Sequence, residues 1–168
     1  MSYAIRLKTV SYIILILLLC CLCVSCGTRK TDNDSKNPTF VVETVSAKAG
    51  DKDVAVNVLV KNNPGISSIA LQVVYNETEL SLTNYIFNEN IGGQYAPFNA
   101  AAYPPKLVWI NWSENVEGDW IFATLYFAVS DSADGKYNIK VTYNPEDIYN
   151  IDEQNIKFEI IDGGIILK

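Results

Sequence analysis

DVAVNVLVK, residues 53–61, places a valine at positions 54, 56, 58 and 60, with smaller or polar residues at most positions between. This period of two predicts a β-strand that buries one face. Turn residues follow it, as in NNPG (62–65), and they recur along the chain, as in NPED (144–147). Similar runs rich in β-branched and aromatic residues occur at 40–48, 68–75, 106–112, 120–129, 137–143, 156–161 and 164–168.

The pattern predicts an all-β domain over residues 39–168. The only helical candidates are single turns near residues 145–149. Many short strands at this spacing favour a β-sandwich, and about 130 residues suffice for one sandwich core. We therefore expect two packed antiparallel sheets and no second domain after residue 38.

The first 26 residues have a different character. Arg6 and Lys8 precede an apolar run from residue 12 to residue 24, which is shorter than the roughly 20 residues of a membrane span. This arrangement predicts an export signal, with an uncleaved anchor helix as the alternative. The segment CVSCG (23–27) resembles a bacterial lipobox, although Cys23 stands where leucine is usual. It predicts a lipid on Cys26 and attachment to the extracellular face of the membrane; alternatively, these cysteines are only small apolar residues of the signal.

Residues 27–38, GTRKTDNDSKNP, are polar, contain no aromatic residue and end in proline, which predicts a flexible tether. The domain that follows has 8 lysines and no arginine against 17 acidic residues, a net charge of −9. Such a domain is not expected to bind nucleic acid, because phosphate binding requires a basic surface. All 4 cysteines lie at or before Cys26, so the domain can form neither a disulfide nor a thiolate metal site.

The residue types of the chain give little support for a catalytic function. The chain contains no histidine, which removes the commonest general base and most catalytic zinc sites. Its carboxylates lie mostly in predicted turns, where solvated side chains are usual, and no glycine-rich phosphate loop precedes a helix. We expect a protein that is not an enzyme and has no cofactor or metal of its own.

Several stretches, in order, resemble the cohesin domains of cellulosome-type scaffolds. They are GDKDVAVNVLVKN (50–62), PGISSIALQVVYNETELSLT (64–83), AYPPKLVWINWSEN (102–115), GDWIFATLYFAV (118–129) and IIDGGIIL (160–167). The resemblance implies a nine-stranded jelly-roll sandwich without enzymatic activity. It also implies a monomeric cell-surface receptor for dockerins, the calcium-loaded helical modules carried by polysaccharide-degrading enzymes or scaffold proteins. Calcium is then expected on the partner.

The resemblance also implies which face binds. Parity in 68–75 directs Ile69, Leu71, Val73 and Tyr75 to the core. The opposite residues are Ser68, Ala70, Gln72 and Val74, and they form a flat face that a helix could approach without desolvating charge. Relatives have Asn and Asp near positions 68 and 70, so the partner of this chain is expected to be more hydrophobic. The alternative is a sandwich face covered by a loop.

The run at 106–112 is expected to complete this face. If Trp112 is buried, then Leu107, Trp109, Asn111 and Ser113 point outward, and Trp109 becomes an exposed anchor. A slip of one residue would bury Trp109 and expose Trp112 instead. The resemblance to cohesins also implies that Tyr103 and Glu114 contact the partner at the two ends of this face. The predicted dockerin-binding residues are Ser68, Ala70, Gln72, Tyr103, Trp109, Asn111, Ser113 and Glu114.

Two other functions compete with dockerin binding. A carbohydrate-binding module would stack sugars on exposed aromatic residues such as Trp109, Trp120, Tyr95 and Tyr103. It needs two or three coplanar aromatic rings on one strip, whereas the parity of the strands exposes only Trp109 clearly. A generic adhesin-like surface domain has no positive feature in the sequence.

Overall fold

The computed structural model describes residues 37–99 and 102–168, and the predicted signal, Cys26 and the tether up to residue 36 lie outside this range. The described residues form two sheets. The five-stranded sheet has the order β11-β1-β3-β8-β5. Its strands are β1 (Thr39–Val42), β3 (Val54–Lys61), β5 (Leu80–Phe87), β8 (Trp120–Val129) and β11 (Glu159–Ile161).

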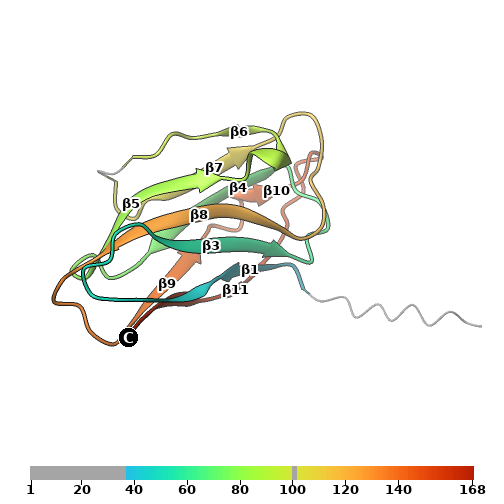
Figure 1. Cartoon of the computed structure of the whole chain (residues 1–168). Coiled ribbons are helices and arrows are strands. Elements are labelled where there is room, and N and C mark those ends of the chain that lie inside the picture. Colours follow the sequence, from blue (N-terminus) through green and yellow to red (C-terminus); the bar gives the residue numbers. More distant parts are fainter. Residues whose placement is uncertain (1–36, 100–101) are drawn as a thin grey trace, which may run out of the picture. The chain divides into compact units, whose positions relative to one another are not determined.

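The seven-stranded sheet has the order β2-β12-β9-β4-β7-β6, with β10 paired to β4 beside this path. Its strands are β2 (Thr44–Ala47), β4 (Ser68–Val74), β6 (Gln94–Tyr95), β7 (Lys106–Ile110), β9 (Lys136–Thr142), β10 (Ile148–Tyr149) and β12 (Gly163–Leu167). A single 3₁₀ turn, η1 (Glu89–Ile91), precedes β6. Figure 1 shows the order of the strands along the chain.

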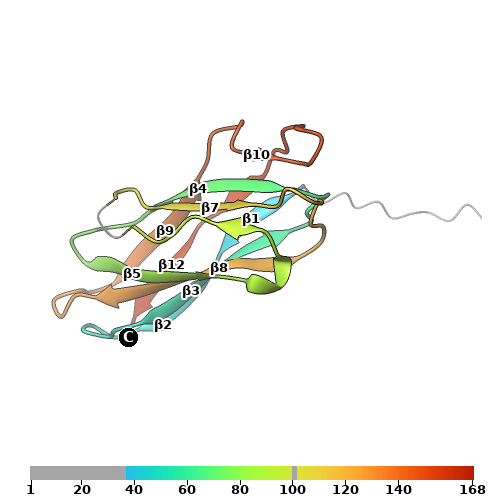
Figure 2. The same ribbon diagram turned by 90° about the horizontal axis from the view of Figure 1, so that it is seen from above.

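The resemblance to a nine-stranded jelly roll is confirmed. The described residues form 12 short strands, because three strands of the sandwich are interrupted. β1 and β2 are one segment broken at Glu43, β11 and β12 are one segment broken at Asp162, and β9 and β10 both pair with β4. Joined in this way, the segments make nine strands. They lie in two layers (Figure 2).

Alternation of side chains builds the core between the layers. In β3, Val56, Val58 and Val60 are fully buried, as the period of two predicts. Phe40, Phe122 and Phe127 meet them from neighbouring strands of the same sheet. The seven-stranded sheet contributes residues such as Leu71, Leu107 and Ile139 from its inner face. No helix among the described residues is long and apolar enough to span a membrane.

The first and last strands close the sandwich by parallel pairing. β1 pairs with β11, and β2 pairs with β12. Gly163 begins β12 where the chain passes the backbone of Val42 and Glu43, and a Cβ atom at Gly163 would collide with both of their carbonyl oxygens. The absence of a side chain at this position therefore allows the closing strand to pack against the first one.

Candidate functional site

The outer face of β4 and β7 forms a surface that we call the platform. The two strands are antiparallel, with Ser68 opposite Ile110, Ala70 opposite Val108 and Gln72 opposite Lys106. Residues opposite each other point to the same side of a sheet. The platform therefore consists of Ser68, Ala70, Gln72, Val74, Lys106, Val108 and Ile110.

The predicted facing of β4 is confirmed by burial. Ile69, Leu71 and Val73 are fully buried, whereas Ala70 and Gln72 are half-buried on the outer face. Ser68 is only 7% exposed. Tyr149 of β10 lies opposite Ser68 in the antiparallel pair of β10 and β4. The side chains that β4 contributes to the platform are thus uncharged and mostly small. The Ser68 end of the platform lies next to β10.

The predicted facing of β7 is wrong. Trp109 is fully buried and Trp112 is 70% exposed. The cause is the register, since Trp109 lies opposite Ile69, whose side chain faces the core. The Trp109 indole N–H donates to the Gly92 carbonyl at 2.7 Å. Gly93 packs directly against this indole. A Cβ atom at Gly93 would lie only 2.5 Å from Nε1 of Trp109, so a larger residue at this position would collide with the ring.

Asn111 is also not on the platform. It is 7% exposed, its backbone N–H donates to the Ser67 carbonyl at 2.7 Å, and its side-chain oxygen accepts from the Ser113 N–H at 3.0 Å. It therefore closes the end of β7. Ser113 and Glu114 are exposed in the segment that follows. Of the predicted residues, Ser68, Ala70 and Gln72 lie on the platform, and Ser113 and Glu114 lie beyond its Ser68 end.

Tyr103 lies at the other end of β4. Its ring meets the Tyr75 ring edge to face at 5.5 Å, and its hydroxyl donates to the Tyr75 carbonyl at 2.8 Å. It remains 46% exposed. Burial raises the pKa of Tyr75, so that phenol is a neutral hydrogen-bonding group at physiological pH.

The segment from residue 143 to residue 156 adds a raised border to the platform. β10 holds it against β4, and Figure 2 shows the chain around β10 standing above the β4 layer. Asn150 fixes the turn that follows, because its side-chain oxygen accepts from the N–H groups of Asp152 at 3.1 Å and Gln154 at 2.8 Å. The Ile151 N–H donates to the Asn115 side chain at 2.7 Å, which ties this turn to the segment after β7.

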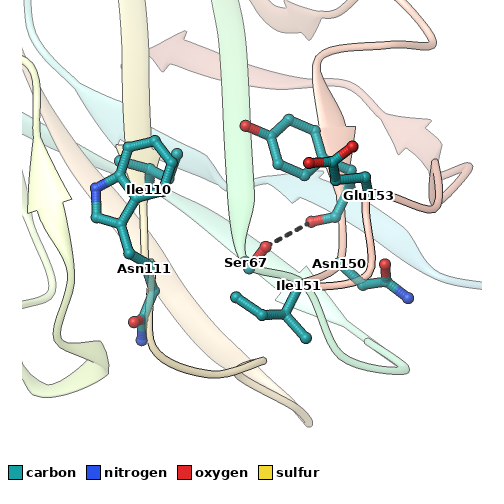
Figure 3. A pocket seen from close by; sticks show the side chains of 8 residues that line it. Ser67, Ile110, Asn111, Asn150, Ile151 and Glu153 are labelled. Atoms are coloured by element: carbon teal, nitrogen blue, oxygen red, sulfur yellow. Dashed lines mark hydrogen bonds between the residues drawn. The ribbon is translucent and has the colours of Figure 1, made fainter.

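A pocket of about 250 Å³ lies between this border and the end of β7. Ile110, Trp112 and Ile151 supply its apolar walls, and Glu153 lies at its rim. Figure 3 shows Ile151 and Glu153 facing Ile110 and Asn111 across Ser67, whose hydroxyl donates to the Tyr149 carbonyl at 3.4 Å. We call it the Trp112 pocket; its lining residues are Ser67, Ile110, Asn111, Trp112, Tyr149, Asn150, Ile151 and Glu153.

Sequence reasoning missed Val108, Ile110 and Trp112 as platform or pocket residues, and it missed the turn at Ile151. The signal for Trp112 was the alternative register of the run at 106–112, in which the two tryptophans exchange faces. Nothing in the sequence indicated that residues 148–149 pair with β4. Among the described residues, no three His, Cys, Asp or Glu side chains gather as a metal site.

Residues 38–166 match the model of the cohesin domain family. No curated protein matches this sequence. Three solved structures share the fold at low sequence identity. The cohesin–dockerin complex Coh-OlpA–Doc918 of Clostridium thermocellum has a TM-score of 0.68 and 17% identity, covering 79% of this chain and 100% of that chain.

The sixth cohesin of Acetivibrio cellulolyticus scaffoldin B, solved in complex with a Cel5 dockerin, has a TM-score of 0.68 and 20% identity, covering 79% of this chain and 100% of that chain. The solution structure of CaCohA2 from Clostridium acetobutylicum has a TM-score of 0.65 and 17% identity, covering 80% of this chain and 92% of that chain. The likeness extends over nearly the whole of each neighbour, so the sandwich described above corresponds to a complete domain in these proteins.

Proposed function

The chain belongs to the cohesin domain family, and from this premise we propose that it is a non-catalytic cell-surface receptor for dockerin modules. The enzymes or scaffold proteins that carry these dockerins would be held at the cell for polysaccharide catabolism. The observation that carries the proposal is the platform itself, whose β4 side has only uncharged and mostly small side chains from Ser68 to Val74 and whose one charged residue, Lys106, lies near the Val74 end. Two of the solved relatives are complexes with dockerins.

The chemistry of the platform suits a docked helix. Ala70 and Val108 face each other at its centre and both are half-buried, so a helix can approach closely without displacing a charged side chain. Trp112 is 70% exposed at one end. Tryptophan is enriched among the interface residues whose truncation to alanine lowers the binding free energy most. These features support a partner that is more apolar than one bound through paired charges.

The exposed aromatic residues do not favour a carbohydrate-binding module. Trp109 is buried, and Trp112 and Tyr103 are the two most exposed aromatic side chains among the described residues. Trp112 lies beside the Ser68 end of β4, whereas Tyr103 contacts Tyr75 beyond the other end. The seven residues of β4 separate these ends by roughly 20 Å, so the two rings do not form one stacking strip.

Attachment to the membrane is part of the proposal and is supported by the sequence alone. The apolar run that ends in Ser25, Cys26 and Gly27, followed by a polar tether, favours a lipid on Cys26. A tether of about a dozen flexible residues would hold the domain clear of the bilayer. The receptor would then face outward, where dockerin-bearing enzymes are secreted.

Binding of dockerins can be measured directly. Residues 35–168 contain the whole hydrophobic core, and a relative of the same extent has been solved as a separate domain in solution, so this fragment is suitable. We expect calorimetry against the dockerin modules encoded in the same genome to identify at least one partner, with binding abolished by a calcium chelator because calcium folds the dockerin. If none of these calcium-loaded dockerins binds, the proposed function is wrong.

A further inference from the structure

Charged side chains on and around the platform are segregated along β4. Lys106 lies opposite Gln72, and Lys140 of β9 lies opposite Val74, so both lysines point outward near the end of β4. Neither takes part in an ion pair, since the only one among the described residues joins Lys61 and Asp119. This end of the platform therefore presents two exposed positive charges, although Glu77 lies in the turn beyond Tyr75.

The Ser68 end carries the opposite charge. Glu153 lies at the rim of the Trp112 pocket, and Glu114 and Asp152 are exposed beside two of its apolar walls. The segments that build this end contain no lysine or arginine, because none occurs from 107 to 135 or from 141 to 156. A partner segment lying along β4 would thus meet negative charge at one end and positive charge at the other.

The Trp112 pocket adds an apolar site at the negative end. Its walls, Ile110, Trp112 and Ile151, come from a strand, the segment after it and the turn held by Asn150. It adjoins the Ser68 end of the platform, because Ile110, which lies opposite Ser68, also lines the pocket. A volume of about 250 Å³ accommodates one aliphatic or aromatic side chain.

We propose that the partner helix binds in one direction only. In that direction an apolar side chain fills the Trp112 pocket, a basic side chain beside it faces Glu153, and an acidic side chain near the other end faces Lys106 and Lys140. The helix N-terminus lies at the Trp112 end, because the positive end of a helix dipole is favoured next to carboxylates. This inference rests on the proposed function, since it assumes that the partner presents a helix to the platform.

Reversal of such a helix would place like charges together at both ends. It would also move the apolar side chain away from the Trp112 pocket. Opposite charges at an interface select register and orientation, whereas juxtaposed like charges oppose binding. The two directions should therefore differ clearly in affinity even though the centre of the platform is neutral.

Two hydrocarbon-stapled helical peptides test the direction. Each has about 14 residues, which span ~21 Å and match the length of β4. Both have leucine in the first turn and small apolar residues along one face. One has arginine beside this leucine and glutamate in the last turn; the other has these two charges exchanged. We expect the first peptide to bind residues 35–168 more tightly by on the order of tenfold in fluorescence titrations at low salt, and the difference to shrink at high salt.

A charge-exchange variant of the domain provides the matched control. Glu153→Lys combined with Lys106→Glu leaves the net charge unchanged, and we expect it to reverse the preference between the peptides. Equal affinities of the two peptides for the wild type, an unchanged preference in the variant, or no binding of either peptide would overturn the proposed direction. Dockerin binding that is unaffected by the exchange would overturn it as well and leave the receptor function intact, whereas a lack of any dockerin binding would refute the receptor function.

Discussion

Ala70→Arg should block dockerin binding while the domain stays folded. Ala70 lies opposite Val108 at the centre of the platform, and its side chain points away from the core. An arginine here would be covered by the docked helix. Asp147 lies beside this position, because its backbone carbonyl accepts from the Ala70 N–H at 3.1 Å, and its side chain ends in a carboxylate. This carboxylate already accepts from Asn144 at 3.0 and 3.2 Å.

The expected loss follows from desolvation of the added charge. An unpaired charge that is buried at an interface costs several kcal/mol, and a loss of ~3 kcal/mol corresponds to roughly a hundredfold weaker binding. Because Ala70 is only half-buried and faces outward, the free energy of unfolding should change by less than about 0.5 kcal/mol. Calorimetry with a cognate dockerin and thermal melting of the same samples measure both quantities.

Ser46→Arg is the matched control for this variant. Ser46 is exposed on the same sheet and lies opposite Ile166 of β12, three strands away from β4 in the sheet order. The control adds the same charge to the domain outside the platform, so it should bind normally. Undiminished binding by Ala70→Arg, or equal losses in both variants, would show that the dockerin does not dock over the centre of β4 and β7.

Three further predictions follow from other parts of the chain. Trp109→Ala should lower the free energy of unfolding by about 3–5 kcal/mol, whereas Trp112→Ala should leave the melting temperature nearly unchanged and weaken dockerin binding by about 2 kcal/mol; the opposite pattern in melting and calorimetry would contradict the observed register of β7. Gly163→Ala should destabilise the domain by roughly 1–3 kcal/mol in denaturant titrations, because its methyl group strikes the backbone at Val42; a neutral result would argue against this close packing. Cys26→Ala should abolish labelling of the full-length protein by a fatty-acid analogue and its partition into detergent, and a labelled variant would rule out lipidation at this position.

The facing of β4 could be predicted from the sequence because its two sides differ in chemistry. Ile69, Leu71 and Val73 alternate with residues that are small or polar at 68, 70 and 72. A period of two and a difference in polarity together identify the buried side. The same reasoning predicted the buried valines of β3.

The facing of β7 could not be predicted in this way because both of its sides are apolar. Leu107 and Trp109 alternate with Val108 and Ile110, so the pattern identifies two sides without ranking them. The burial of Trp109 depends on its pairing opposite Ile69 and on the Gly92 carbonyl that accepts from its indole. Both partners are distant in sequence, and their alignment is a property of the sheet.

The raised border of the platform, residues 143–156, could not be predicted from the sequence either. Residues 145–149 suggested at most one helical turn, yet Ile148 and Tyr149 form β10 against β4. Two residues are too short to produce a periodic pattern. The acidic character of this end was visible in the sequence, but its position beside Trp112 depended on the fold.

The parallel pairing of the terminal strands has a consequence for when the domain can fold. Asn37 and Glu159 are hydrogen-bonded at 2.6 Å although they are 122 positions apart, and the last residue, Lys168, donates its N–H to the Ala47 carbonyl at 3.0 Å. Contacts of such long range slow folding, because the chain between them must be ordered before they form. The first strands therefore lack these partners until residues 159–168 have been synthesised. Under the proposed export, this delay would keep the chain unfolded and competent for translocation, with the sandwich closing only after residues 159–168 have crossed.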